Sequence, residues 1–295
     1  MVVVTGATGH VGGTLARRLR ARGVPLRVIG RSADRLAELA RQGAEPHVGS
    51  IDDAAFLTKA FSGATAVFAM VPPDYGTPDH RAYQRRVGDA IATAVQGAGV
   101  PRVVSLSSVG AERDSGNGPI AGLHDLEQRL EAVPGLHALH LRPAYFMENH
   151  LHGIGLIKAR GIYGTPIKAD SPFAMIATRD IGAAAAEVLA APSFTGRSFR
   201  ELLGPRDYSM RETTRILGQA IGRPDLAYVE FPYEDARQAL VQTGLSADVA
   251  RLFVEMYDGF NSGRVRPVQG RRPETTTPTT LEQFAADTFA PASKA

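Results

Sequence analysis

A glycine-rich turn near the beginning of the chain constrains the fold more than any other feature. The turn that follows the apolar run 2–4 reads Thr5-Gly6-Ala7-Thr8-Gly9-His10-Val11-Gly12. Apolar residues then recur every four positions as far as Leu19, which indicates a helix. A G-x-x-G-x-x-G turn between a strand and a helix is typical of a dinucleotide-binding βαβ unit. The alternative is a glycine-rich turn that binds nothing.

Each glycine of this turn has its own expected role. Gly6 permits the tight turn, Gly9 lets the backbone approach a pyrophosphate, and Gly12 lets the helix pack closely on the strand. The free N–H groups at the start of the helix then face the phosphates. The cofactor contacts of the turn are therefore expected from Gly6, Thr8, Gly9, His10, Val11 and Gly12.

Strand-like and helix-like segments alternate through the first half of the chain. Short apolar runs predict six strands, at 2–4, 26–29, around 48, 66–71, 103–106 and 139–141. Helical spacing between most of these runs predicts a Rossmann-type α/β fold with a doubly wound parallel sheet. We place the dinucleotide-binding domain at 1–150, with 173–203 returning to it. A smaller, mostly helical lobe that covers the substrate is expected at 151–295.

The end of the second expected strand indicates which dinucleotide is bound. NAD sites usually carry an Asp or Glu there, which binds the ribose hydroxyls. This chain reads Ile29-Gly30-Arg31-Ser32 instead, so no carboxylate repels a 2′-phosphate. Arg31 can pair with that phosphate and stack on adenine, and Ser32 can donate a hydrogen bond. The sequence predicts NADP(H), the alternative being a solvated arginine beside a helix cap.

These motifs resemble one known family. The glycine turn and the Gly-Arg-Ser segment are similar to those of the NmrA-like group of atypical short-chain dehydrogenase/reductases. Val103–Ser108 and Leu141–Asn149 resemble the group's segments after the fifth and sixth strands, and Phe173–Ala190 resembles its returning strand and helix. Within the group, the chain is most similar to NADPH-dependent quinone reductases.

The resemblance implies further contacts at the nicotinamide end of the cofactor. They are expected from residues at the ends of the fourth, fifth and sixth strands, namely Val71, Pro72, Ser107, Pro143, Tyr145 and Phe146. Tyr145 or Phe146 could stack on the nicotinamide or on a flat substrate, although aromatic residues are more often packed in a core. Nearby Asn149, His150 and His152 invite a metal site, which we reject because no acidic or cysteine cluster supports it.

The proton donor is less clearly indicated than the cofactor. Ordinary short-chain reductases use a Tyr-x-x-x-Lys pair, but the segment 118–127 contains neither residue. Some quinone reductases of the group carry a His on this helix, and His124 matches that place. With an ordinary pKa near 6.5, a His there can donate a proton or orient the cofactor ribose. The alternative for His124 is a structural hydrogen bond.

Composition excludes several other classes. The chain has no cysteine, which excludes disulfides and thiolate catalysis. A net charge of +3 does not indicate nucleic acid, and we expect Arg264, Arg266, Arg271 and Arg272 to lie in a solvated connection. No secretory signal or membrane-length apolar run is evident, so a cytoplasmic protein is expected.

Two functional classes remain at this stage. The first is an NADPH-dependent reductase of a small quinone, carbonyl or conjugated compound. The second is a regulator of the NmrA type, which senses NADP(H) without turnover and acts through a protein partner. The missing Tyr-x-x-x-Lys pair favours the regulator, and a second lobe able to cover the nicotinamide favours the reductase. A homodimer is left open.

Overall fold

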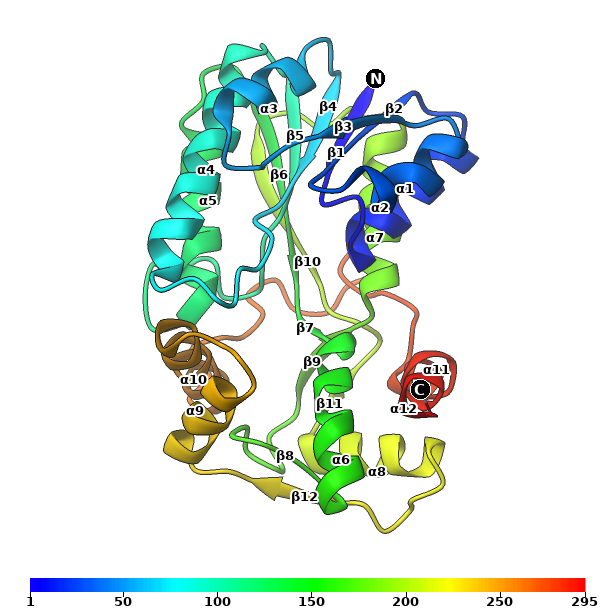
Figure 1. Cartoon of the computed structure of the whole chain (residues 1–295), viewed down its shortest axis with the longest axis vertical. Helices are drawn as coiled ribbons and strands as arrows, with labels where there is room; N and C mark the ends of the chain where they lie inside the picture. Colours follow the sequence, from blue (N-terminus) through cyan, green and yellow to red (C-terminus); the bar gives the residue numbers. More distant parts are fainter. Residues whose placement is uncertain (295) are drawn as a thin grey trace.

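The computed structural model describes residues 1–294 as two lobes stacked along the long axis (Figure 1). The upper lobe contains a seven-stranded sheet in the order β10-β6-β5-β4-β1-β2-β3, and all its neighbouring strands run parallel. Its strands are β1 (Val2–Thr5), β2 (Leu26–Gly30), β3 (Glu45–Val48), β4 (Ala66–Ala69), β5 (Arg102–Leu106), β6 (His137–Pro143) and β10 (Arg197–Leu202). The predicted doubly wound sheet is confirmed.

Helices cover both faces of this sheet, which explains why its strands are apolar runs. On one face lie α1 (His10–Ala21), α2 (Ala33–Arg41) and α7 (Thr178–Ala190). On the other face lie α3 (Ala54–Phe61), α4 (His80–Gly97) and α5 (Ala121–Glu131). A strand covered on both faces has no solvent side to alternate with, so β1 and β4 are buried along their whole lengths.

The return of the chain to the sheet differs in detail from the expectation. The strand at 173–176, β9 (Phe173–Ile176), pairs with β7 (Tyr145–Phe146) and β11 (Asp207–Tyr208) in a separate small sheet. The seventh strand of the large sheet is instead β10, for which no strand was predicted. Its sequence carries two arginines and is exposed at its first two residues, because it lies at the edge of the sheet.

The lower lobe combines short strands with helices. Besides the small sheet, it contains η2 (Met147–Gly153), α6 (Ile154–Arg160), β8 (Ile162–Thr165), α8 (Met210–Ala220), β12 (Ala227–Glu230), α9 (Tyr233–Gln242), α10 (Ala247–Asn261), α11 (Leu281–Phe284) and α12 (Ala290–Lys294). Ser209 and Ser246, the N-caps of α8 and α10, accept hydrogen bonds from Glu212 N and Val249 N. A reciprocal capping box lies at Thr280 and Gln283, at the start of α11.

The arginine-rich connection is solvated at Arg266, Arg271 and Arg272, as expected, and some of its arginines are also paired within the chain. Arg264 pairs with Asp258, and Arg271 pairs with Asp207 and donates to the carbonyl of Leu203 at 3.1 Å. Arg272 donates to the carbonyl of Gln269 at 2.9 Å. Among residues 1–294, no helix is long and apolar enough to cross a membrane.

A buried histidine lies in the core of the lower lobe. His150 has no exposed surface, its Nδ1 lies 2.7 Å from the hydroxyl of Tyr163, and its Nε2 lies 3.5 Å from Met175 Sδ. Because a thioether sulfur can only accept, this arrangement fits an Nε2–H tautomer in which Nδ1 accepts from Tyr163. Burial lowers the pKa of His150 to about 3, so the ring is neutral in the folded protein.

This buried histidine predicts a loss of stability in acid. Unfolded histidine titrates near 6.5, so between that pH and about 3 the unfolded chain binds a proton that the folded chain does not. We expect this residue alone to lower the free energy of unfolding by about 2 kcal/mol at pH 5 relative to pH 7.5. Urea unfolding at the two pH values, compared between the wild type and His150→Phe, measures this difference.

The variant is expected to be less stable at neutral pH but to lose less on acidification. His152→Phe, at an exposed position two residues away, is the control and should keep the wild-type pH dependence. An unchanged acid dependence in His150→Phe would contradict the assignment.

Candidate functional site

The glycine turn lies at the carboxyl edge of the large sheet, which faces the lower lobe (Figure 1). Gly6 has a positive φ of 63°, a conformation that glycine adopts without strain. The N–H of Gly9 donates to the carbonyl of Gly6 at 3.0 Å. Beneath the turn, Thr5 Oγ1 donates to Phe68 O at 3.1 Å and accepts from Met70 N at 3.2 Å, so β1 and β4 end at the same level.

Gly12 and Gly9 lack a side chain for different reasons. A Cβ on Gly12 would lie 2.3 Å from the carbonyl oxygen of Gly6, so the packing of α1 on the turn requires glycine there. A Cβ on Gly9 would meet only that same oxygen, at 3.4 Å, which is an ordinary contact. The protein's own packing therefore leaves the space above Gly9 open.

The start of α1 is suited to bind an anion. Gly9 is its N-cap and supplies no side-chain acceptor, and no acidic residue lies in the first turn. The first N–H groups of the helix therefore lack a capping side chain, and the helix dipole adds positive potential there. Together with the open space at Gly9, these donors fit a phosphate group.

Two arginines, not one, lie beside this turn. Arg31 is exposed at the end of β2, as predicted from the sequence. Arg35, in the first turn of α2, donates from Nη2 to the carbonyl of Thr8 at 3.4 Å, and sequence reasoning missed it. Ser32 Oγ accepts from Arg35 N at 3.4 Å, which leaves its O–H free to donate. The signal for Arg35 was a second arginine one helical turn after Arg31.

The end of β4 forms the other side of the turn. Val71 and Pro72 are half-buried there, and Pro72 O accepts from the hydroxyl of Tyr83 at 2.9 Å. Burial raises the pKa of Tyr83 to about 12, and the positive charge of Arg31 opposes the rise. The hydrogen bond of Tyr83 thereby ties α4 to the segment after β4.

Ser107 is engaged in a buried network behind β5. Its hydroxyl donates to Glu127 Oε1 at 2.5 Å, and Arg142 donates to the same carboxylate from Nε at 2.9 Å and from Nη2 at 2.5 Å. Ser107 is only 3% exposed, and Pro143, at the end of β6, is also buried. The hydroxyl of Ser107 is thus already satisfied by protein.

His124 borders a polar cavity on the loop after β5. Its Nδ1 lies 2.8 Å from the carbonyl of Ala111, which can only accept, so Nδ1 carries the proton and Nε2 is left available. The cavity has a volume of about 340 Å³ and is lined by His124 with Glu112, Arg113 and Asp114.

The two aromatic residues after β6 point into different cores. Tyr145 is 8% exposed, and its ring centroid lies 5.5 Å from those of His150 and Phe173. Phe146 is half-buried against the core of the upper lobe. The face of Tyr145 is therefore covered by protein, which is the packing alternative considered from the sequence.

The residues considered for a metal site do not converge. His150 is occupied by Tyr163 and Met175, and His152 is exposed. Across residues 1–294, no three His, Asp or Glu side chains are placed together as ligands would be.

Comparison with known proteins identifies the family. The model of the NmrA-like family matches residues 1–285, nearly the whole chain. The chain belongs to the NmrA-like family. The resemblance deduced from the glycine turn and from the segments after the fifth and sixth strands is thereby confirmed.

Two relatives of this NmrA-like protein are named as reductases. It is 28% identical over 257 residues to "NAD(P)H azoreductase" of Xenophilus azovorans, covering 87% of this chain and 86% of the relative. It is 32% identical over 241 residues to "(4-alkanoyl-5-oxo-2,5-dihydrofuran-3-yl)methyl phosphate reductase" of Streptomyces griseus, covering 82% and 80%.

The fold also matches a solved structure. The NADPH-dependent quinone oxidoreductase QOR2 of Escherichia coli, complexed with NADPH, superposes with a TM-score of 0.82 and 23% identity, covering 98% of this chain and 100% of that one. At this identity, the likeness establishes the shared fold.

The two glycines of the NmrA-like turn should respond differently to the same substitution. Gly12→Ala places a methyl group against a backbone carbonyl, so the free energy of unfolding should fall by roughly 1–3 kcal/mol. Gly9→Ala should change it by less than about 1 kcal/mol, since the methyl group meets no tight contact. Urea unfolding of both variants without cofactor measures the contrast. Equal destabilisation would mean that Gly9 is also required by packing.

Proposed function

We propose that this chain is an NADPH-dependent reductase that transfers hydride to a small quinone, carbonyl or conjugated substrate. The observation that carries the proposal is the cradle at the glycine turn. It combines open space above Gly9, an uncapped helix start, Arg31 where NAD enzymes carry a carboxylate, and Arg35 against the carbonyl of Thr8. The names of the relatives support a reductase, because both are reductases and one is an NAD(P)H enzyme.

Different residues of the cradle would bind different parts of the cofactor. The N–H groups of His10, Val11 and Gly12 would bind the pyrophosphate, with Thr8 and Gly9 leaving room for it. Arg31 and Arg35 would pair with the 2′-phosphate, and Ser32 would donate its remaining hydrogen.

The nicotinamide end would lie near the ends of β4 and β6. Val71, Pro72 and Phe146 keep exposed surface there and would contact it. The bound cofactor supplies the hydride; the protein's part is to hold donor and acceptor together and to exclude water.

The substrate class follows from the absent Tyr-x-x-x-Lys pair. A quinone, an azo compound or an unsaturated lactone accepts hydride readily because the added charge is delocalised. Such an acceptor needs orientation more than it needs strong acid catalysis. The relatives' azo and dihydrofuranone substrates both have this conjugated character.

His124 is proposed to supply a proton to the reduced product. Its Nδ1 is held by Ala111, so Nε2 is the atom that can take a proton from solvent and pass it on. The cavity that His124 borders is also lined by Glu112, Arg113 and Asp114.

Cofactor selection is tested at Arg31. Arg31→Ala should raise the dissociation constant for NADPH roughly ten- to a hundred-fold, because a charge-assisted bond to the 2′-phosphate is lost, and should change that for NADH little. Calorimetric titration of both cofactors measures the effect. Arg35→Ala should act in the same direction, and Arg18→Ala, at an exposed position on α1, should be silent. Equal wild-type affinity for the two cofactors would exclude the proposed 2′-phosphate site.

Turnover is tested by mixing the protein with NADPH and a panel of 1,4-naphthoquinone, an azo dye and an unsaturated aldehyde. We expect loss of nicotinamide absorbance with at least one acceptor, and a kcat for the aldehyde at least roughly tenfold lower in His124→Ala. Tight NADPH binding without oxidation by any acceptor would favour the non-catalytic sensor instead. A wild-type rate in His124→Ala would leave His124 with its structural bond alone.

A further inference from the structure

Helix α10 of the lower lobe is fixed against two loops at the carboxyl edge of the large sheet (Figure 1). At its start, Asp248 Oδ2 accepts from His80 N at 2.9 Å, and Ser246 N donates to Tyr75 O at 2.9 Å. Both contacts hold the loop after β4. Along its middle, α10 touches the loop after β5, where a Cβ on Gly118 would lie 2.1 Å from Leu252 O.

One face of α10 carries aromatic residues at helical spacing, namely Phe253, Tyr257 and Phe260. The Phe253 ring lies edge-on to Tyr75 at 5.9 Å and to Tyr257 at 6.4 Å. At the other end, Phe260 lies 5.9 Å from Tyr145. This aromatic row therefore runs from the loop after β4 to the residues after β6. Those are the strand ends between which a hydride acceptor would have to lie.

The hydroxyl of Tyr257 is uncommitted. Four other tyrosines are engaged: Tyr163 with His150, Tyr228 with Thr165 and Ile167, Tyr83 with Pro72, and Tyr233 with Asn261. The neighbouring Tyr75 also makes no side-chain hydrogen bond within the described chain, but it is exposed. The hydroxyl of Tyr257 makes no hydrogen bond to any other residue of the described chain. It is also not among the side-chain polar atoms that are fully buried without a hydrogen-bond partner. Its ring is half-buried, so the hydroxyl is surrounded by protein and still reachable.

The environment keeps this hydroxyl protonated. Burial raises the pKa of Tyr257 to about 12, and the neighbouring hydroxyl of Tyr75 adds to the rise. A phenol that stays neutral at physiological pH is a constant hydrogen-bond donor. The upper lobe lacks such a donor in the segment 118–127, and the hydroxyl of Ser107 is bound to Glu127.

We propose that Tyr257 is a catalytic residue supplied by the lower lobe, whose hydroxyl donates a hydrogen bond to the substrate atom that gains negative charge as hydride arrives. Phe253 and Tyr75 form the adjoining aromatic wall against which a flat acceptor lies. The acceptor gains two electrons and one hydrogen as hydride from NADPH, and its oxygen or nitrogen takes a proton from water or His124. Tyr257 keeps its own proton throughout and stabilises the intermediate anion.

This inference rests on the proposed reductase function and is tested with Tyr257→Phe, which keeps the ring and removes only the hydroxyl. With 1,4-naphthoquinone, kcat/KM should fall roughly ten- to a hundred-fold, the loss of one donor to a developing anion. The melting temperature and the dissociation constant for NADPH should be unchanged. Tyr233→Phe, which removes an exposed hydroxyl from the same lobe, is the matched control and should retain wild-type turnover.

Binding gives a readout that does not depend on turnover. Without NADPH no hydride is present, so the affinity for 1,4-naphthoquinone can be titrated directly, and it should be several-fold weaker in Tyr257→Phe. If the wild type oxidises NADPH and Tyr257→Phe has the same kcat/KM, the proposed role of Tyr257 is wrong. The proposed reductase function would still stand. If the wild type oxidises no NADPH, the proposed reductase function is contradicted. In that case, unchanged naphthoquinone affinity in Tyr257→Phe would exclude Tyr257 as a substrate contact. Weakened affinity in the variant would support Tyr257 as a contact.

Discussion

The close approach of α1 to the glycine turn is the constraint on which the rest of the structure depends. Gly12 lies so near the carbonyl of Gly6 that no side chain fits between them, which fixes the start of α1 at the carboxyl edge of the sheet. Helix α7 also packs closely on α1, because a Cβ on Gly182 of α7 would lie 2.8 Å from Val11 O. The start of α1 and the beginning of α7 are thereby held in one rigid unit.

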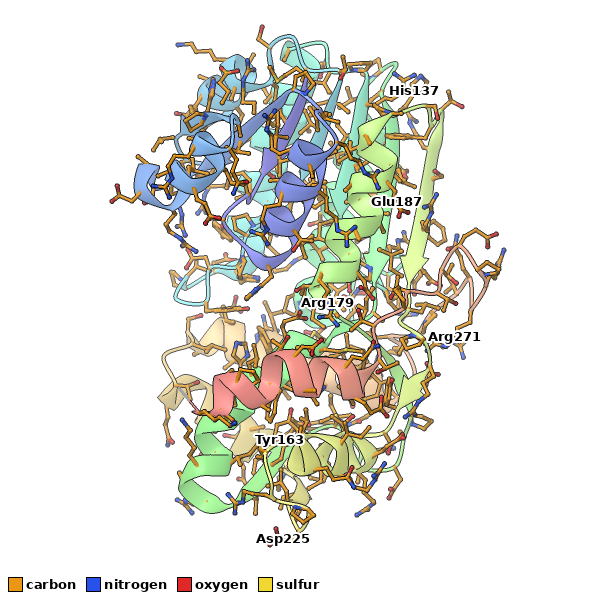
Figure 2. All side chains as sticks on the ribbon, turned by 90° about the vertical axis from the view of Figure 1, so that its right-hand side faces the viewer. His137, Tyr163, Arg179, Glu187, Asp225 and Arg271 are labelled. Atoms are coloured by element: carbon orange, nitrogen blue, oxygen red, sulfur yellow. The ribbon has the colours of Figure 1, made fainter. Side chains whose placement is uncertain are left out.

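The lower lobe is attached to that unit through the first turn of α7. Glu148 accepts from Thr178 N at 3.0 Å and from its Oγ1 at 2.6 Å, so a carboxylate from the lower lobe caps the helix. Asp180 accepts from Thr279 N at 2.9 Å, and Arg179 donates to Thr279 Oγ1 at 3.1 Å. Figure 2 shows Arg179 where the lobes meet, beside the C-terminal helices. Packing at the glycine turn therefore also sets where the lower lobe stands relative to the proposed cofactor site.

The upper lobe was predictable because its signals are local. Strands that are buried on both faces appear in the sequence as continuous apolar runs. The turn appears there as Gly6, a glycine at a position whose φ is positive. Strand β10 was not predicted because an edge strand needs no continuous apolar run. The small sheet was not predicted because β7 and β11 have only two residues each. Arg35 follows Arg31 by one helical turn, but its contact with Thr8 joins segments that lie 27 residues apart in the sequence. The cofactor contacts predicted for the residues of the glycine turn remain predictions.

The chemical end of the site was least predictable, because it depends on how two lobes meet. Ser107 and Tyr145 stand at the expected strand ends, yet the buried Glu127 engages the first and an aromatic cluster covers the second. Polar groups buried behind a sheet must be paired, so they hold the scaffold and are poor candidates for contacting substrate. The proposed donor Tyr257, whose hydroxyl remains reachable, lies on α10, more than a hundred residues later in the chain. Because the segment 118–127 carries no Tyr-x-x-x-Lys pair, a donor for the proposed reduction can come from the lower lobe as well as from His124.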